Sequence, residues 1–310
     1  MVANERFLIH SLNDGASDTM QLSDVQNRRL TNGFMLTRVG VTGVKKPVAV
    51  DRAGHLVTLT CTFDVFVDLP SEQRGSHLSR NLEVITDVVE GSLSKPVKGI
   101  EELASNMAKD LLERHEYATY SEVNIEADYF LERTVPSGRK TMESFKLMAK
   151  AISRKGNGMK KMIGVQVIGM TACPCAMETV KDLQRGNLRF KDSDLPNITH
   201  NQRNVATLMI EIPEELDIEA NDLIEIAEAS FSSPTFEILK RSEEAMVVIQ
   251  AHDHPKFVED VVRENLQRIL MKYTDLPDQT LVTVRSESEE SIHKHNAFAE
   301  RITTLGELRG

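Results

Sequence analysis

A Cys-Pro-Cys sequence and a histidine that follows it provide side chains typical of a metal site. Cys173 and Cys175 flank Pro174, and His200 lies further along the chain. Thiolate and imidazole, joined by a carboxylate, bind borderline divalent metals such as zinc and iron(II). The fixed φ of Pro174 would hold both sulfurs in a defined direction. Two alternatives remain. The two cysteines could be buried and inert, because free cysteine is among the most buried residue types. His200 could be a surface or capping residue, as a lone histidine beside a turn often is.

A second group of such side chains lies near the C-terminus, where Glu290 is followed by His293 and His295. On an extended segment residues i and i+2 share a face, so both imidazoles could point into one pocket. A metal with three protein ligands keeps a position open for water and lowers the pKa of that water to about 7. A nearby histidine can then transfer protons. Glu290 could accept two parallel hydrogen bonds from a guanine edge, or be a solvated charge in the acidic stretch 287–290. The two groups together predict a metal-dependent enzyme.

The composition is that of an ordinary globular protein and excludes several other classes. The chain has 310 residues, 40% hydrophobic and 27% charged, with a net charge of −10. This charge argues against binding to a nucleic-acid backbone, and the absence of tryptophan argues against a stacking platform for single strands. We find no run near the roughly 18 apolar residues of a membrane span and no signal peptide. Three cysteines cannot form a disulfide framework, so we expect a cytoplasmic protein.

The elements that must position these residues follow from hydrophobic periodicity. Alternating apolar residues predict strands at 56–67, 123–129, 162–170, 205–212 and 280–285. Helical spacing predicts helices around 82–89, 100–111, from 222, and after Pro255, which would occupy a first turn. We interpret residues 134–160 as a turn, a short helix and a basic loop. The pattern predicts an α+β protein of two tandem units, 22–160 and 161–310, after a loosely ordered lead-in, 1–21.

In combination these motifs resemble the prokaryotic type IB GTP cyclohydrolases. The resemblance runs from about residue 22 to the C-terminus. It includes Cys173-Pro-Cys175, His200-Asn-Gln-Arg203 and Glu290-Ser-Ile-His293-Lys-His295, with further matches at residues 24–26, 38–44, 74–80 and 255–261. The long segment between Cys175 and His200 and the sequence after residue 295 are similar to the archaeal MptA branch, which begins methanopterin synthesis.

The resemblance implies a fold and an assembly. It implies the tunnelling fold, in which antiparallel sheets carry helices packed on one face and two such units occur in each chain. It also implies a homotetramer with active sites at subunit interfaces.

The resemblance further implies roles for particular residues. Cys173 and His200 would bind the metal, Fe(II) in the archaeal branch, with zinc or manganese also possible. Bacterial members carry a third ligand, a glutamate, at the position of Pro234. Glu237 is the nearest carboxylate and is our candidate for this ligand. The remaining matches predict substrate-binding or catalytic groups: Cys175, Glu290, His293, His295, Arg203 and His77.

The implied reaction is the opening of the guanine imidazole ring of GTP. Water activated by the metal would add to C8, Glu290 would hold the base edge, and His293 or His295 would transfer protons as formate leaves. The archaeal branch forms 7,8-dihydroneopterin 2′,3′-cyclic phosphate with loss of pyrophosphate, which requires a cation such as Arg203 near the α-phosphate.

Other functions stay open at this point. A bacterial-type enzyme would form dihydroneopterin triphosphate by the same ring opening. A nitrile reductase of the same fold would attack a purine-like substrate through Cys175 or Cys173 without a metal. A non-catalytic assembly protein would use the metal only for stability.

Overall fold

Alternating apolar residues build one continuous antiparallel sheet. The computed structural model describes residues 24–31, 33–52, 55–186, 198–213 and 216–310; the predicted lead-in, 1–21, lies outside them. Within these residues the strand order is β1-β2-β3-β4-β5-β6-β8-β9, and β7 pairs with β5. The bounds are β1 (Leu36–Arg52), β2 (His55–Leu69), β3 (Tyr120–Thr134), β4 (Lys140–Arg154), β5 (Gly158–Ala172), β6 (Asn201–Ile212), β7 (Ser233–Pro234), β8 (Leu281–Glu289) and β9 (Ala297–Thr304).

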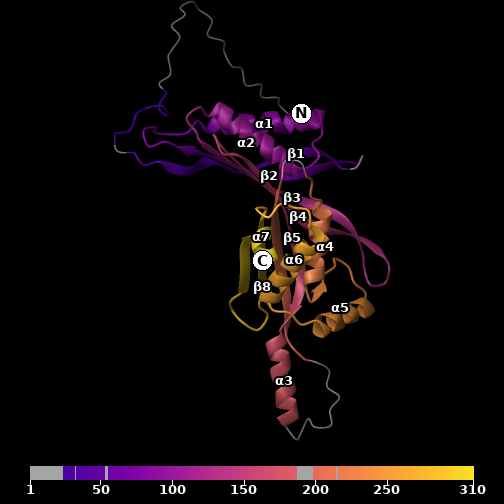
Figure 1. The fold of residues 1–310 in the computed structure, drawn as a ribbon. Coiled ribbons are helices and arrows are strands. Elements are labelled where there is room, and N and C mark those ends of the chain that lie inside the picture. Colours follow the sequence, from indigo (N-terminus) through magenta and orange to yellow (C-terminus); the bar gives the residue numbers. More distant parts are fainter. Residues whose placement is uncertain (1–23, 32, 53–54, 187–197, 214–215) are drawn as a thin grey trace, which may run out of the picture.

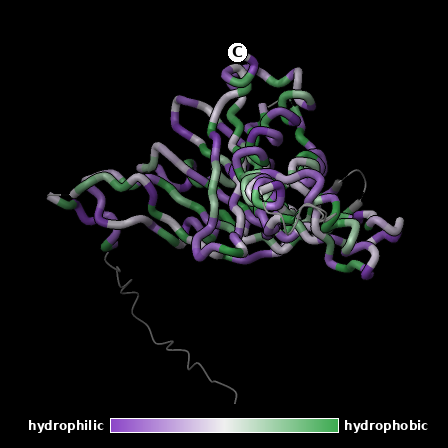
Figure 2. Tube along the Cα trace, turned by 90° about the horizontal axis from the view of Figure 1, so that it is seen from below, coloured by the Kyte–Doolittle hydropathy of each residue, from purple (hydrophilic) through white to green (hydrophobic). Residues whose placement is uncertain are grey.

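One face of this sheet is apolar along its whole width. The register places a row of buried side chains directly opposite one another across six strands, and all belong to a single core: Cys61, Ala127, Leu147, Val165, Leu208 and Val284. Their neighbours along each strand point to the other face, because side chains alternate in a strand. Figure 2 shows this alternation of hydrophilic and hydrophobic residues.

Helices cover the apolar face in two pairs (Figure 1). The first pair, α1 (Leu78–Ser94) and α2 (Ile100–Arg114), packs on the sheet of the first half, and the second pair, α4 (Ala220–Ser230) and α6 (Val258–Lys272), packs on β5, β6, β8 and β9. Buried residues of both pairs belong to the same core as the strands. The predicted α+β architecture with helices packed on one face is therefore confirmed.

The second half carries additional elements that the first half lacks. These are α3 (Pro174–Gly186), α5 (Arg241–Asp253) and β7, and the chain ends in α7 (Leu305–Arg309). Helix α3 extends away from the body at the end opposite α1 and α2 (Figure 1). The predicted boundary at 160/161 falls near the start of β5, and the sheet continues across it, so the division into two units stays a prediction. No helix among the described residues is long and apolar enough to cross a membrane.

Two local predictions were wrong. Residues 140–154 form the long strand β4, whose alternating burial at Phe145, Leu147 and Ala149 is partly hidden by helix-forming lysine, methionine and alanine. Pro255 precedes α6 and is not in its first turn. The helix begins after Phe257, whose backbone N–H donates to Asp260 Oδ2 at 3.0 Å, and this contact fixes the start of the helix.

Candidate functional site

Cys173 lies where β5 ends and α3 begins. Its Sγ accepts a hydrogen bond from the backbone N–H of Ala176 at 3.5 Å, which is the contact that an N-capping side chain makes. Pro174 follows at the first helical position, where its missing N–H has no cost. The Cys-Pro sequence therefore starts a helix, and the thiol lies at the helix N-terminus.

Antiparallel pairing of β5 with β6 brings His200 beside Cys173. Ala172, the last residue of β5, lies opposite Asn201, the first residue of β6. The residues just beyond this pair are linked directly, because Cys173 N–H donates to the carbonyl oxygen of His200 at 3.1 Å. Thr199 Oγ1 also donates to the carbonyl oxygen of Cys173 at 2.7 Å. Two predicted site residues that lie apart in the sequence are thus held together by the strand register.

Glu290 reaches the same place from the end of β8. Its side chain is 10% exposed, and its Oε2 lies 3.5 Å from His200 Nε2. Gln202 Nε2 donates to Glu290 Oε1 at 3.3 Å. The sequence motifs assign no role to Gln202. The i, i+2 spacing from His200 nevertheless indicates that both side chains lie on the same face of the strand.

His293 and His295 lie in the connection between β8 and β9. Residues 291–295 bend instead of forming the extended segment that we expected. The two imidazole rings are nonetheless adjacent, stacked with 5.1 Å between their centroids. The ring of His293 also meets that of His200 edge-on at 6.4 Å. His293 therefore faces His200, and His295 stacks on His293.

These side chains line one cavity of about 290 Å³. The cavity is walled by residues at the end of β5, the start of β6, the end of β8, the β8–β9 connection, the start of β9 and the start of α6. The lining residues are Cys173, His200, Gln202, Lys256, Phe257, Val258, Glu259, Ser288, Glu290, His293, His295, Ala297 and Phe298.

Other predicted site residues lie elsewhere in the chain. Arg203 and Glu237 line a second cavity of about 280 Å³. Arg203 follows Gln202 in β6 and therefore points to the opposite face of the sheet. Cys175 is exposed on the first turn of α3 and does not line the first cavity. His77, just before α1, is in the first half of the chain, where its Nε2 lies 3.3 Å from Asn27 Oδ1.

The comparison with known families identifies the relationship. A family model described as "Type I GTP cyclohydrolase folE2" matches residues 22–299. The chain belongs to this family. It is 46% identical over 300 residues to the GTP cyclohydrolase MptA of Methanothermobacter thermautotrophicus, covering 92% of this chain and 94% of that protein. It is 43% identical over 309 residues to the protein of the same name from Methanosarcina mazei, covering 94% and 97%.

A solved structure supports the fold predicted for a member of this family. The chain superposes on uricase from Arthrobacter globiformis with a TM-score of 0.53 at 8% sequence identity, covering 90% of this chain and 96% of that one. At this identity the similarity concerns the fold alone. Together with the one-sided packing of helices on an antiparallel sheet, it shows the tunnelling fold.

The donor atoms at the first cavity suit a borderline divalent metal such as zinc or iron(II). Cys173 offers a thiol, His200 an imidazole and Glu290 a carboxylate, all lining one space. Among the described residues, however, no group of three or more such side chains is already arranged to hold an ion. The candidate third ligand, Glu237, lines the other cavity, where Ser144 Oγ donates to its Oε1 at 3.3 Å. One chain therefore brings together two of the three predicted ligands.

Proposed function

We propose that this enzyme is a metal-dependent GTP cyclohydrolase that opens the imidazole ring of guanine at C8 and releases formate. The product would be 7,8-dihydroneopterin 2′,3′-cyclic phosphate, formed with loss of pyrophosphate in tetrahydromethanopterin synthesis. The observation that carries the proposal is the convergence of Cys173, His200, Glu290 and the two histidines on one cavity in a chain of this family.

Cys173 and His200 would hold the metal, with Fe(II) as our candidate and zinc or manganese as alternatives. A metal held there lowers the pKa of bound water and so supplies a nucleophile at neutral pH. Glu237 stays a prediction for the third ligand. Since it lines a different cavity of the same chain, it would have to meet the other two donors from a neighbouring subunit or after a rearrangement.

Glu290 would bind the guanine edge. Its two oxygens could accept hydrogen bonds from N1–H and the exocyclic amino group in parallel. Gln202 and His200, which contact one oxygen each, would fix the orientation of the carboxylate. Phe257 and Phe298 add aromatic surface to the same cavity. Its volume is near the lower limit for small-molecule sites, which suits the base better than the whole triphosphate.

His293 and His295 would transfer protons during ring opening. Their rings lie side by side and one faces His200, so a proton could pass from one imidazole to the other. A histidine serves this purpose well because its ordinary pKa lies near neutral pH.

We further propose a homotetramer in which neighbouring subunits complete the site. Arg203, Cys175 and His77 would then contact the substrate from the partner side, with Arg203 on the α-phosphate. None of the three lines the first cavity in its own chain. Light scattering coupled to size exclusion would test the assembly. A cytoplasmic location stays a prediction.

The experiment is an anaerobic incubation of metal-stripped protein with GTP, with and without Fe(II). Formate is measured and the pterin is identified by mass. We expect Fe(II)-dependent formate and a cyclic monophosphate. A retained triphosphate would support the bacterial-type alternative, and no formate with any divalent metal would reject the proposal.

Substitutions of Cys173 and His200 test whether the proposed reaction takes place in the first cavity. Cys173→Ala and His200→Ala should lose bound metal and formate release together, because each removes a donor atom. Met271→Ala is the control, since Met271 is exposed and lies outside the cavity lining. Full activity in a metal-free Cys173→Ala protein would contradict the assignment.

A further inference from the structure

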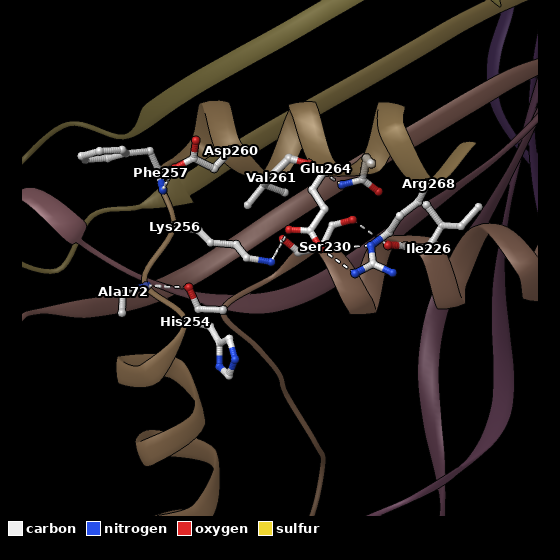
Figure 3. A network of polar contacts seen from close by, with 12 residues as sticks. Ala172, Ile226, Ser230, His254, Lys256, Phe257, Asp260, Val261, Glu264 and Arg268 are labelled. Atoms are coloured by element: carbon white, nitrogen blue, oxygen red, sulfur yellow. Dashed lines mark hydrogen bonds and ion pairs between the residues drawn. The ribbon is translucent and has the colours of Figure 1, made fainter. Parts of the chain in front are cut away.

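The segment that joins α5 to α6 holds the strand end that carries Cys173. Lys256 N–H donates to the carbonyl oxygen of Ala172 at 3.0 Å (Figure 3). On its other side Ala172 is held by Ser232, because Ala172 N–H donates to Ser232 Oγ at 3.2 Å. Ala172 directly precedes Cys173. The position of the thiol therefore depends on where the backbone of Lys256 lies.

The side chain of Lys256 fixes that backbone from within the protein. Only 16% of this side chain is exposed. Its Nζ donates to the carbonyl oxygen of Ser230 at 3.1 Å and to Glu264 Oε2 at 2.5 Å. Ser230 is the last residue of α4, and a helix C-terminus attracts a positive charge. The ammonium thus ties the segment to both α4 and α6.

Glu264 is itself held by a second cation. Arg268 donates to Glu264 Oε1 from Nε at 3.0 Å and from Nη2 at 2.6 Å. Burial would raise the pKa of Glu264, but the hydrogen bonds from Lys256 and Arg268 outweigh it and lower the pKa. The carboxylate is therefore ionised at neutral pH and keeps the Lys256 ammonium in place. A cation neutralised in this way is poorly suited to bind a substrate phosphate, although Lys256 lines the cavity.

We propose that Lys256 is a positioning residue for Cys173. Through Glu264 and the end of α4, its side chain fixes the 254–257 segment, whose backbone in turn fixes Ala172 and so the thiol relative to His200. This inference rests on the proposed function of Cys173 as a metal ligand. Groups that orient a ligand without touching the metal typically change metal affinity or activity by about 10- to 100-fold.

The test compares Lys256→Met and Lys256→Arg with a matched control, Lys272→Met. Lys272 also joins α6 to α4, through Asp222 Oδ1 at 3.1 Å, but from the other end of α6. Co²⁺ affinity is measured by chelator competition, the thiolate-to-cobalt band by absorption, and kcat and KM from formate release. For Lys256→Met we expect Co²⁺ affinity and kcat to fall about tenfold or more, a weaker thiolate band, and a KM for GTP within about twofold of wild type. Lys256→Arg should restore most of the loss, and Lys272→Met should match wild type.

Three results would overturn the inference. Wild-type cobalt affinity and kcat in Lys256→Met would show that the ammonium does not position the thiol. A higher KM with unchanged kcat would assign Lys256 to substrate binding. Equal losses in Lys256→Met and Lys272→Met, with lower melting temperatures in both, would indicate a role in stability alone.

Amide hydrogen exchange separates this inference from the proposed function. In the metal-free protein, exchange in the peptide covering residues 171–177 should be about tenfold faster in Lys256→Met than in wild type or Lys272→Met. If wild type binds no cobalt and releases no formate, the proposed function fails. The exchange result alone then decides whether Lys256 positions Cys173, and unchanged exchange rejects it.

Discussion

Lowering the pH from 7 to 5 should destabilise the first half of the fold through one buried histidine. His115 is fully buried at the end of α2. Its Nε2 lies 2.6 Å from Asn81 Oδ1 and its Nδ1 lies 2.9 Å from Tyr117 Oη, which in turn lies 2.8 Å from Ser76 Oγ. A neutral imidazole fits this chain of hydrogen bonds, with Nε2–H donating to Asn81 and Nδ1 accepting from Tyr117.

The size of the effect follows from the pKa of His115. Burial lowers this pKa from 6.5 to about 4, and electrostatic interactions with Arg80 and His77 act in the same direction. As the pH falls, the unfolded chain takes up the proton first, so stability is lost between pH 6.5 and pH 4. At 1.36 kcal/mol per pKa unit, the loss reaches about 2 kcal/mol at pH 5 and about 3 kcal/mol below pH 4.

Equilibrium unfolding in urea at pH 7 and pH 5, at one protein concentration, measures this loss. Wild type should lose about 2 kcal/mol more than His115→Gln over this interval, whatever the stability of the variant at pH 7. Met271→Ala, which changes an exposed side chain that does not titrate, should keep the wild-type pH dependence. Carboxylates with lowered pKa values, such as Glu122, lose their contribution only below about pH 4.5 and do so in all three proteins. Identical pH dependence in wild type and His115→Gln would refute the reasoning.

Three further outcomes are expected. Glu290→Gln should lower kcat/KM for GTP about 100-fold while bound metal is retained, because an amide group replaces one of the two acceptors that we propose for the base; loss of metal in this variant would contradict the proposed role. Burial raises the pKa of the Cys61 thiol to about 12, so iodoacetamide at pH 8 should modify only the other two cysteines of the native metal-free protein, as mass spectrometry would show. Gly169→Ala should lower the melting temperature by the equivalent of about 1–3 kcal/mol, because its Cβ would lie 2.1 Å from the ring of Phe231; Gly186→Ala, which faces open space, is the control.

The sequence predicted β2, β3, β5, β6 and β8 because burial on one face imposes a period of two on these strands. It made no prediction of α3, α5 or β9. It failed at β4, where small and long polar residues carry the same alternation and only Thr141 and Ile152 are β-branched. Tertiary pairing on both sides, with β3 and β5, outweighs the local preference there.

Only part of the predicted set of site residues meets in one place: Cys173, His200, Glu290, His293 and His295 line one cavity, whereas the lining does not include Glu237, Arg203, Cys175 or His77. Residue types and spacing indicated Cys173 and His200, yet their contact depends on the register that sets Ala172 opposite Asn201. A sequence motif also does not show to which face of the sheet each of its side chains points. Arg203 is adjacent to Gln202 in sequence, but strand alternation places the two on opposite faces of the sheet, and only Gln202 reaches Glu290.

Because the Cys173 thiol caps α3, the stability of this helix is coupled to the binding of any ligand at the sulfur atom. Of the described residues of α3 only Met177 is buried, and the helix extends away from the body (Figure 1), so its free energy depends strongly on its first turn. A ligand that changes the charge on Cys173 Sγ changes the strength of the cap and hence the population of the helix. Coupling between two equilibria is reciprocal. Changes in helix propensity along the solvent-exposed length of α3 would therefore alter ligand affinity at Cys173, without any contact to the ligand.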